Sequence, residues 1–422
     1  MTAAHSSKLE ALTIVPPVRP LVGLITPPGS KSITNRALLL AALARGTSRL
    51  TGALKSKDTA LMAKALVQMG VGVEEPDETS FVVTSDGTLK APTEPLMLGN
   101  AGTATRFLTA AVSLVYGRVV VDGEESMRKR PIEPLLVALR SLGIDATAAT
   151  GCPPVVINGT GHFGRGRVTI DGGLSSQYVS ALLMAAPFGD GPIEVQLTGK
   201  DLDARGYVNL TLAAVRAFGA EAEQVDEMTW RVEPTGYRAT DFAIEPDASA
   251  ATYLWAAEAL TGGRIDLGVA MEAFTQPDAE AARFIRQFPH MPAVIDGSQM
   301  QDAVPTLAVL AAFNETPVRF VGIANLRVKE CDRISALSTE LSRIRAGLAH
   351  EEGDDLVVSS DPKLAGQVLP TRIETYEDHR IAMAFALAGL RIGGITILDP
   401  LCVGKTYPGY WDALRSLGVE LR

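Results

Sequence analysis

The chain has 422 residues, of which 46% are hydrophobic and 21% charged, and its formal net charge at pH 7 is -9. This length allows two or more domains, and the acidic balance argues against a nucleic-acid-binding protein, which usually has a basic face. The cysteines Cys152, Cys331 and Cys402 form no C-x-x-C pattern, and the 5 histidines show no metal-ligand spacing. We therefore expect no disulfide framework and no metal site, in a protein of the reducing cytoplasm. No apolar run reaches the roughly 18 residues of a membrane helix.

The first predicted element is a helix that follows a polar loop in PPGSKSITNRALLLAAL, residues 27–43. Ser30 stands where a helix N-cap is expected, and Lys31 and Arg36 add positive charge near the free N–H groups of the first turn. Such a helix start can bind an anion. The nucleotide-binding pattern G-x-x-x-x-G-K-[ST] is not met, because only Ser30 separates Gly29 from Lys31. Two interpretations stay open: a capped helix with a solvated lysine, and a phosphate-binding loop.

A polar loop followed by an Ala- and Leu-rich helix recurs along the chain. The six segments, in chain order, are 29–43, 99–114, 172–187, 245–260, 301–313 and 376–390. Successive anchor residues are separated by 72, 73, 72, 55 and 76 positions, the anchors being Ser30, Gly102, Ser175, Asp247, Asp302 and Asp378. A near-constant spacing of this length indicates an internal repeat of compact supersecondary units.

Strands and further helices are predicted between these segments. Runs rich in Val, Ile and Thr and bounded by Gly, Pro or Asp are typical of strands, and they lie at 49–54, 80–85, 118–123, 154–159, 167–172, 192–199, 229–234, 355–360 and 394–400. Second helices, each ending on a glycine as a C-cap should, lie at 58–70, 133–143, 209–219 and 334–347. The pattern predicts an α/β protein of six repeats, three per domain.

Cationic residues gather in the polar loops of this pattern. They are Lys31, Arg36, Arg106, Arg128, Lys129, Arg130, Arg327, Lys329, Arg333, Arg380 and Lys405. Binding residues concentrate in short loops between apolar elements. We therefore expect a cleft that binds a multiply anionic ligand, although the whole chain is acidic.

Seven motifs resemble, in their order along the chain, those of the EPSP synthase family, the 5-enolpyruvylshikimate-3-phosphate synthases (3-phosphoshikimate 1-carboxyvinyltransferases). They are PGSKSITNRALLLAALA, LGNAGTATRFLTA, DGEESMRKRPI, GGLSSQYVSALL, NLRVKECDRISA, YEDHRIAMAFALAG and VGKTYPGYWDAL. The resemblance implies transfer of the enolpyruvyl group of phosphoenolpyruvate to the 5-hydroxyl of shikimate 3-phosphate, with release of phosphate, in the shikimate pathway of chorismate and aromatic amino-acid biosynthesis. It also implies that no metal or organic cofactor takes part, and that glyphosate competes with phosphoenolpyruvate.

The resemblance further implies a two-domain inside-out α/β barrel (EPT/RTPC-like) of six βαβαββ repeats, three per domain. The chain would cross between the domains near Ile25 and Glu245. Residues 1–25 and 246–422 would then form a discontinuous domain, and residues 26–245 a continuous one. The active site would lie in the cleft between the domains, and we expect a monomer.

By the same resemblance, two sets of residues hold the substrates. Phosphoenolpyruvate would be bound by Lys31, Gly102, Arg128, Gln177, Arg333, Arg380 and Lys405. Shikimate 3-phosphate would be bound by Ser32, Arg36, Ser175, Ser176, Gln177, Tyr207, Asp302, Asn325 and Lys329. These residue types suit the ligands, because arginine makes bidentate contacts with carboxylate and phosphate and glycine lets the backbone approach a ligand closely.

The reaction needs one group that takes the proton of the 5-hydroxyl and one that protonates the methylene carbon. Asp302 is the candidate base, although its place just before an apolar helix also fits an N-cap. Glu330 and Lys31 are the candidates for proton transfer at the methylene carbon, with His379 supporting Glu330. The alternative for Glu330 is a surface ion pair with an arginine of its own loop.

Four positions depart from the family pattern. Phe107 stands where the family usually has proline, Ala204 where a serine often assists the phosphate, and Gly206 where a proline is common. Cys331 replaces a common threonine, and we interpret it as a packing residue. We expect glyphosate to inhibit less strongly than is usual in the family. Proline at 107, taken as an early helix position, is expected to tighten inhibition.

Three rival functions are weighed against this one. The UDP-N-acetylglucosamine enolpyruvyl transferases share the fold, but they use a cysteine in a loop where this chain has SMRKRPIEP, residues 126–134. A non-catalytic anion-binding protein on the same fold would not need Asp302, Glu330 and His379 together. A nucleotide kinase is disfavoured by the loop spacing around Lys31.

Overall fold

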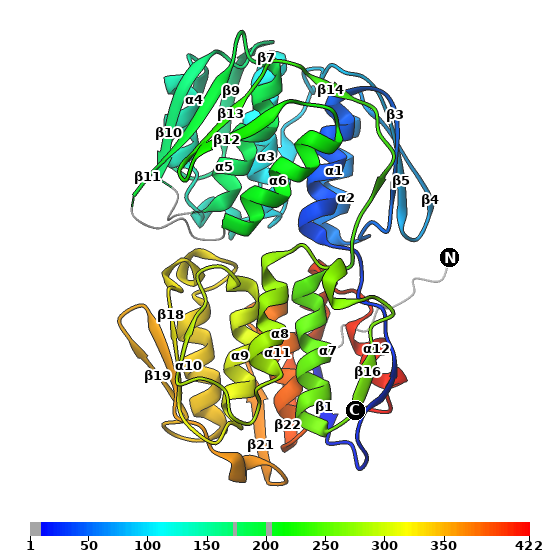
Figure 1. Ribbon diagram of the computed structural model, residues 1–422, viewed down its shortest axis with the longest axis vertical. Helices are drawn as coiled ribbons and strands as arrows, with labels where there is room; N and C mark the ends of the chain where they lie inside the picture. Colours follow the sequence, from blue (N-terminus) through cyan, green and yellow to red (C-terminus); the bar gives the residue numbers. More distant parts are fainter. Residues whose placement is uncertain (1–9, 172–174, 200–204) are drawn as a thin grey trace, which may run out of the picture. The chain divides into compact units, whose positions relative to one another are not determined.

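The computed structural model describes residues 10–171, 175–199 and 205–422 (Figure 1). The chain divides into two compact units. Unit 1 consists of the described residues of Met1–Pro27, Ala248–Ala273 and Asp278–Arg422, and unit 2 of those of Pro28–Asp247 and Phe274–Pro277. The short segment 274–277 therefore belongs to unit 2, although the chain on both sides of it belongs to unit 1.

The described part of unit 2 contains three small mixed sheets that share one topology. In each sheet the first pair of strands is parallel and the other pairs are antiparallel. The strand orders are β14 (Tyr237–Arg238)-β3 (Ala44–Thr51)-β5 (Ser80–Asp86)-β4 (Gly72–Asp77), β6 (Leu96–Met97)-β7 (Tyr116–Asp122)-β9 (Val155–Thr160)-β8 (Asp145–Ala148), and β10 (Gly166–Asp171)-β11 (Ile193–Thr198)-β13 (Thr229–Val232)-β12 (Ala222–Asp226).

Unit 1 repeats this topology in two of its sheets. Its strand orders are β17 (Val294–Asp296)-β18 (Val318–Val321)-β20 (Asp355–Val358)-β19 (Ala349–Glu352), β21 (Val368–Ile373)-β22 (Gly393–Leu398)-β1 (Ala11–Val15)-β23 (Glu420–Leu421), and the two-stranded β16 (Arg264–Asp266)-β2 (Val22–Leu24). The prediction of an α/β fold built from six repeats is confirmed.

Two of the sheets are completed by strands from distant parts of the chain. β1, near the start of the chain, pairs with both β22 and β23 near its end. β14 and β15 (Phe242–Ala243) follow the last repeat of unit 2 and pair with β3 in the first. In each unit, a sheet therefore joins a strand from an early part of the unit's sequence to strands from its last part.

The first helix of each repeat is buried on nearly all sides. These helices are α1 (Lys31–Leu43), α3 (Gly102–Ala111) and α5 (Ser176–Ala185) in unit 2, and α7 (Ala248–Thr261), α9 (Val304–Ala311) and α11 (His379–Gly389) in unit 1. α3 packs against α5, and α11 packs against α9 and α7. An Ala- and Leu-rich helix without a polar face is expected to occupy a protein interior. The predicted helices in these segments are confirmed.

The second helices are mostly amphipathic and cover the sheets. They are α2 (Lys57–Gln68), α4 (Glu133–Ser141), α6 (Arg205–Ala217), α8 (Ala281–Ile285), α10 (Arg333–Ile344) and α12 (Tyr410–Ser416). Gly143 and Gly219 follow α4 and α6 with φ of 84° and 85°, the left-handed conformation that a glycine C-cap adopts. α8 and α12 were not predicted, because five and seven residues are too few for a clear helical period.

Phe107 does not lie early in its helix, as the sequence analysis assumed. α3 begins at Gly102, so Phe107 is its sixth residue, and its side chain is fully buried. The Arg36 guanidinium lies 5.1 Å from the centre of its ring. A proline here would lack the N–H that a helix interior requires and would leave the volume of the ring empty. The premise behind the expected tighter inhibition by proline at 107 was therefore wrong.

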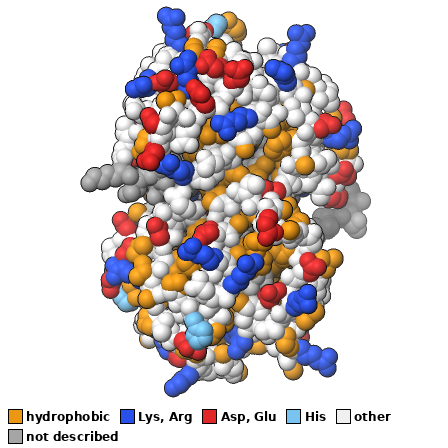
Figure 2. All heavy atoms as spheres, viewed as in Figure 1, with side chains coloured by type: hydrophobic (Ala, Val, Ile, Leu, Met, Phe, Trp, Pro, Cys, Tyr) orange, Lys and Arg blue, Asp and Glu red, His pale blue; other side chains and the backbone are white. Residues whose placement is uncertain are grey.

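Within the described residues, no helix is both long and apolar enough to cross a membrane. Figure 2 shows Lys and Arg side chains interspersed with Asp and Glu over the visible face. On that face, the acidic side chains therefore do not form a single patch.

Candidate active site

Unit 1 contains a buried network of cations and carboxylates around Arg333, the first residue of α10. The Arg333 side chain is 1% exposed; Nε donates to Asp378 at 2.8 Å, Nη1 to Asp302 at 3.0 Å and Nη2 to Glu330 at 2.7 Å. Burial alone would lower the pKa of Arg333, but the three carboxylates raise it above the usual arginine range. The guanidinium therefore stays protonated, and it binds three acidic side chains from three segments of the chain.

Two further cations extend the network. The Arg380 side chain is almost buried, and Nη2 donates to Asp302 Oδ2 at 2.6 Å. Lys405 Nζ lies 2.8 Å from Glu330 Oε1. Asp302 and Glu330 are thus each held between two cations. The side chains of Arg333, Arg380 and Lys405 thus offer three positive charges to a multiply anionic ligand. Such a ligand could replace the carboxylates that now pair with them.

Asp302 is not the N-cap that the alternative interpretation required. It lies in a 3-10 turn, Gln301–Ala303, and the cap position of α9 is Ala303, which makes no side-chain cap bond. The Asp302 carboxylate instead accepts hydrogen bonds from Arg333 and Arg380. Its side chain is 23% exposed, so the side chain is not fully enclosed by the protein.

Glu330 pairs with Arg333, as the alternative for this residue proposed, but the pair is buried rather than at the surface. The Glu330 side chain is 9% exposed. Arg327, the other candidate, is bound to Asp354 and Asp332, each at 2.8 Å. Arg327 therefore serves a separate cluster in its own loop.

Two residues beside Asp378 complete this part of unit 1. His379 is buried, and its Nδ1 lies 3.6 Å from Asp378 Oδ1; its expected support of Glu330 stays a prediction. Cys331 Sγ lies 3.5 Å from Asp378 Oδ2. Burial and the Asp378 charge raise the pKa of the Cys331 thiol well above its ordinary range, which agrees with a packing role and not with a nucleophile.

Two predicted shikimate-phosphate residues lie in the loop that precedes the network. Asn325 is buried in a 3-10 turn, Ala324–Val328, and Lys329 directly follows this turn. Both lie between β18 and α10, the helix that carries Arg333. In the loop NLRVKECDR, the predicted binding residues Asn325 and Lys329 thus lie only a few positions before Arg333 in the sequence.

In unit 2, Lys31 is the first residue of α1, whose N-cap Ser30 accepts a hydrogen bond from Ile33 N. Ser30 Oγ also donates to Gln276 Oε1 at 2.8 Å, which ties segment 274–277 to the helix start. Lys31 Nζ lies 3.6 Å from Asp58, a carboxylate that is almost fully buried. The capped-helix interpretation of this loop is confirmed, but the lysine is paired rather than solvated.

Arg36 is a buried cation held by neutral oxygens. Its guanidinium donates to Thr211 Oγ1 at 2.8 Å, Ser180 Oγ at 3.1 Å, Ser32 O at 2.9 Å and Tyr207 O at 3.2 Å. Burial lowers the pKa of Arg36 to about 10, which keeps it charged at neutral pH. No carboxylate of the residues that the structure describes lies within ion-pair distance of it. Among the described residues, no carboxylate therefore neutralises this buried positive charge.

Gly102 lies against two guanidinium groups. A Cβ atom at this position would be 2.5 Å from Arg106 Nη1 and 2.9 Å from Arg130 Nη1. Arg106 and Arg130 are both buried, and Nη1 of Arg130 donates to Asn100 Oδ1 at 3.3 Å. Only glycine leaves room for both cations beside the start of α3.

Arg128, the predicted phosphoenolpyruvate residue of this loop, has a different environment. Its side chain is 50% exposed, and it is paired with Asp122, which keeps the pKa of Arg128 above its ordinary value. Arg130, two residues later, is the buried arginine at Gly102. Arg130 was one of the predicted loop cations but not one of the predicted phosphoenolpyruvate residues. No local signal in SMRKRP distinguishes it from Arg128.

Ser32, a predicted shikimate-phosphate residue, is the second residue of α1. The predicted residues of the third repeat of unit 2 lie around the starts of α5 and α6. Ser175 caps α5 by accepting a hydrogen bond from Gln177 N, and Gln177 Nε2 lies 3.5 Å from Thr103 Oγ1. Ser176 is buried at the first position of α5. Tyr207 lies in α6, next to Gly206, where a Cβ atom would meet Pro277 at 2.6 Å. Ala204, the other departure in this loop, lies outside the described residues.

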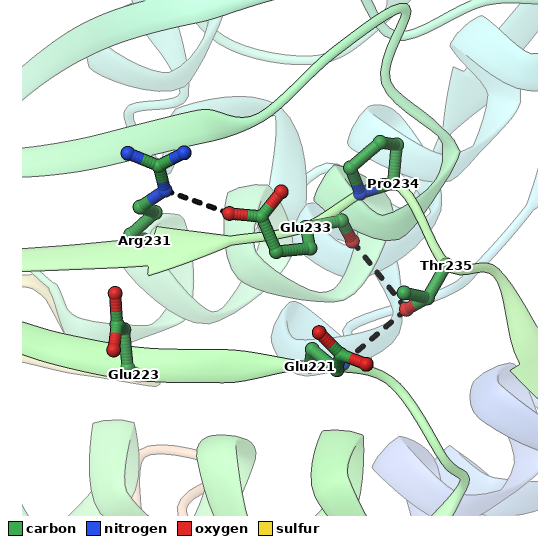
Figure 3. Close-up of a pocket in the computed structure, with 6 residues that line it drawn as sticks. All are labelled: Glu221, Glu223, Arg231, Glu233, Pro234 and Thr235. Atoms are coloured by element: carbon green, nitrogen blue, oxygen red, sulfur yellow. Dashed lines mark hydrogen bonds and ion pairs between the residues drawn. The ribbon is translucent and has the colours of Figure 1, made fainter.

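A hollow of about 460 Å³ in unit 2 does not coincide with these groups (Figure 3). It lies at β12 and β13 and is lined by Glu221, Glu223, Arg231, Glu233, Pro234 and Thr235. Its one cation, Arg231, is paired with Glu233 at 2.7 Å. Three carboxylates around a paired arginine do not suit an anionic substrate. Among the described residues, no three His, Cys, Asp or Glu side chains are grouped as a metal site requires.

Comparison with known proteins agrees with the motifs. The profile of EPSP synthase (3-phosphoshikimate 1-carboxyvinyltransferase) matches residues 15–414. The 3-phosphoshikimate 1-carboxyvinyltransferase of Rhizobium etli is 71% identical over 416 residues, 99% of each chain, and that of Pseudomonas savastanoi pv. phaseolicola is 69% identical over 97% of this chain and 98% of its own. The solved EPSP synthase of Acinetobacter baumannii has a TM-score of 0.79 at 26% identity, over 98% of this chain and 100% of its own.

Proposed function

Since this chain belongs to the EPSP synthase family and catalyses the reaction of that family, we propose which of its residues bind the two substrates and which move the protons. The reaction transfers the enolpyruvyl group of phosphoenolpyruvate to the 5-hydroxyl of shikimate 3-phosphate in the shikimate pathway. The 5-oxygen bonds to C2 of phosphoenolpyruvate while the methylene carbon gains a proton, which gives a tetrahedral ketal. Departure of phosphate and loss of a proton from the new methyl group then restore the double bond.

The proposal is carried by the buried network around Arg333. Arg333, Arg380 and Lys405 would bind the carboxylate and phosphate of phosphoenolpyruvate, since two arginines can each make bidentate contacts. Asp302 and Glu330 hold these cations at 2.6–3.0 Å. When phosphoenolpyruvate pairs with these cations, the carboxylates of Asp302 and Glu330 would lose their present partners. Both would then be able to act on the reacting atoms.

The released carboxylates would then carry the proton transfers. We propose that Asp302 takes the proton of the 5-hydroxyl as the attack on C2 proceeds. Glu330, with Lys31, would deliver the proton to the methylene carbon and later remove one from the methyl group. Asp302 would also orient shikimate 3-phosphate through its second oxygen. His379 would support Glu330 in this role.

We further propose that shikimate 3-phosphate is bound mainly by unit 2. Arg36 offers a buried charge that neutral oxygens alone surround, and the start of α5 offers Ser175 and Ser176 at the positive end of a helix. The other residues of this proposed set are Ser32, Gln177, Tyr207, Asn325 and Lys329, together with Asp302. An anion at Arg36 would supply the negative charge that the described surroundings lack.

For phosphoenolpyruvate, Lys31, Gly102 and Gln177 stay proposed contacts from unit 2. We add Arg130 to them, and we expect it to matter more than Arg128. Arg130→Lys should raise KM for phosphoenolpyruvate about tenfold, because a lysine ammonium cannot reproduce a bidentate contact. Arg128→Lys is the matched control and should change KM less than about twofold, because this side chain is half exposed and paired with Asp122. A larger effect at Arg128 would restore the original assignment.

Several broader features remain proposals. We propose that the two folding domains are residues 1–25 with 246–422 and residues 26–245, and that groups from both act on one pair of substrates. The enzyme is proposed to be a cytoplasmic monomer that needs no metal or organic cofactor. Glyphosate is proposed to compete with phosphoenolpyruvate.

Phosphate release from phosphoenolpyruvate tests the assignment directly. We expect release only when shikimate 3-phosphate is present, in a one-to-one ratio with the enolpyruvyl product. UDP-N-acetylglucosamine should not replace shikimate 3-phosphate. Release with the nucleotide sugar would favour the sister transferase, and binding of both substrates without turnover would favour a non-catalytic anion-binding protein.

A further inference from the structure

The loop that leads into α11 has a strained backbone. Tyr376 and Glu377 both have φ of 55°, the left-handed region that side chains with a Cβ atom disfavour. The pair directly precedes Asp378, and Asp378 N donates to Thr375 O at 2.8 Å. Strain of this kind persists only where the surroundings hold the chain in place.

This strained loop leads into a residue, Asp378, that is hydrogen-bonded to both arginines of the network. Asp378 caps α11 by accepting a hydrogen bond from Arg380 N at 2.8 Å. The same carboxylate accepts a hydrogen bond from Arg333 Nε at 2.8 Å. A shift of Asp378 would therefore move the guanidinium of Arg333 and the first turn of the helix that carries Arg380.

The group that holds the loop is the carboxylate of Glu340, which is fully buried. Glu340 Oε1 accepts a hydrogen bond from Tyr376 Oη at 2.8 Å, and Oε2 accepts one from Glu374 N at 3.1 Å. Glu340 follows Arg333 by seven residues on α10, about two turns, so both side chains leave the same face of the helix. One face of α10 thus binds the loop at two points, at Glu340 and at Arg333.

We propose that Glu340 is a positioning residue, which through Tyr376 and Glu374 holds the strained loop so that Arg333 and Arg380 are arranged to bind phosphoenolpyruvate. The proposal rests on the proposed role of these two arginines. Burial raises the pKa of Glu340, and burial together with Glu340 raises that of Tyr376. A buried carboxylate is unfavourable unless its hydrogen bonds are complete, and here the bonds are made to the loop. Arg343, 3.2 Å away, is the cation that accompanies it.

Tyr376→Phe is the first test. It removes one hydroxyl and keeps the packing of the ring. The fraction of molecules whose loop is competent to bind should fall, and apparent affinity falls by the same factor. We expect KM for phosphoenolpyruvate to rise about fivefold to tenfold, with kcat and KM for shikimate 3-phosphate within about twofold, because the lost interaction is made equally in ground and transition states. Glu340→Gln should have the same signature.

A readout without substrate separates loop position from activity. In both variants, hydrogen exchange of the amides of residues 374–380 should accelerate relative to that of residues 381–389, the remainder of α11. The matched control is Tyr410→Phe, since Tyr410 is also a buried tyrosine of unit 1 and donates to Met383 O at 2.9 Å. It should lower stability without raising KM for phosphoenolpyruvate. An equal rise of KM in the control would overturn the proposal, because the effect would then be a general loss of packing.

Rescue gives a further test. Asparagine adopts the left-handed conformation more readily than glutamate, so Glu377→Asn should restore at least half of the affinity that Tyr376→Phe loses. Absence of rescue would contradict the role of strain. Arg380→Lys, measured in parallel, tests the premise. If it leaves KM for phosphoenolpyruvate unchanged, the proposed function of the arginine is wrong; if it raises KM while Tyr376→Phe does not, the positioning role alone fails.

Discussion

Asp302→Asn is expected to lower kcat by about a hundredfold or more, as loss of a general base typically does. Asparagine keeps the size of the side chain but has no basic carboxylate. Asp302 accepts hydrogen bonds from Arg333 at 3.0 Å and from Arg380 at 2.6 Å, one on each carboxylate oxygen. Asparagine keeps one accepting oxygen, so one of these bonds is lost because an NH2 group cannot accept it. We therefore also expect KM for phosphoenolpyruvate to rise, while the Kd of shikimate 3-phosphate changes little. Steady-state kinetics and calorimetry measure the two effects separately.

Asp355→Asn is the matched control for this variant. Asp355 is a carboxylate of the same unit that is paired with Arg319 at 2.7 Å, and it belongs to none of the proposed binding sets. Its loss should leave kcat within about twofold. If Asp302→Asn abolishes affinity for shikimate 3-phosphate but kcat at saturation survives, Asp302 binds and positions the substrate, and another group is the base.

Gly102→Ala is expected to weaken glyphosate inhibition by about a hundredfold, and to raise KM for phosphoenolpyruvate by only about tenfold. The added methyl group would lie 2.5 Å from Arg106 and 2.9 Å from Arg130, so both guanidinium groups must move. Any anion that depends on them loses affinity. The inhibitor should lose more, because it is the more extended anion and, as the family resemblance implies, would fill the space beside the glycine more fully. The Ki of glyphosate and the KM of phosphoenolpyruvate on one preparation give the ratio.

Gly191→Ala is the corresponding control in unit 2. Its added methyl group would lie 3.6 Å from the nearest atom, an ordinary contact distance. We expect no change in either constant. If Gly102→Ala changed inhibitor and substrate by the same factor, residue 102 would not discriminate between them, and displacement of the two arginines would account for the whole effect.

Much of the fold could be predicted from local patterns in the sequence. The six buried helices were found because an Ala- and Leu-rich run and a polar start are recorded in consecutive residues. Ser30, Ser175 and Asp378 are caps because each side chain bonds to an amide two or three residues ahead. The motifs around these helix starts were also sufficient to identify the family. Such interactions depend on short stretches of chain, so the sequence by itself determined them.

The arrangement of side chains in the site was decided only by the tertiary structure. Arg128 and Arg130 are alike in sequence, but one is exposed beside Asp122 and the other is buried at Gly102. Asp302 fits a helix cap locally, yet Arg333 and Arg380, 31 and 78 residues away, take its carboxylate instead. In the sequence, Glu340 is one polar residue of an amphipathic helix. Only the structure shows that Tyr376 donates a hydrogen bond to it. Burial and charge pairing depend on contacts between distant segments, and no local pattern records which segments meet.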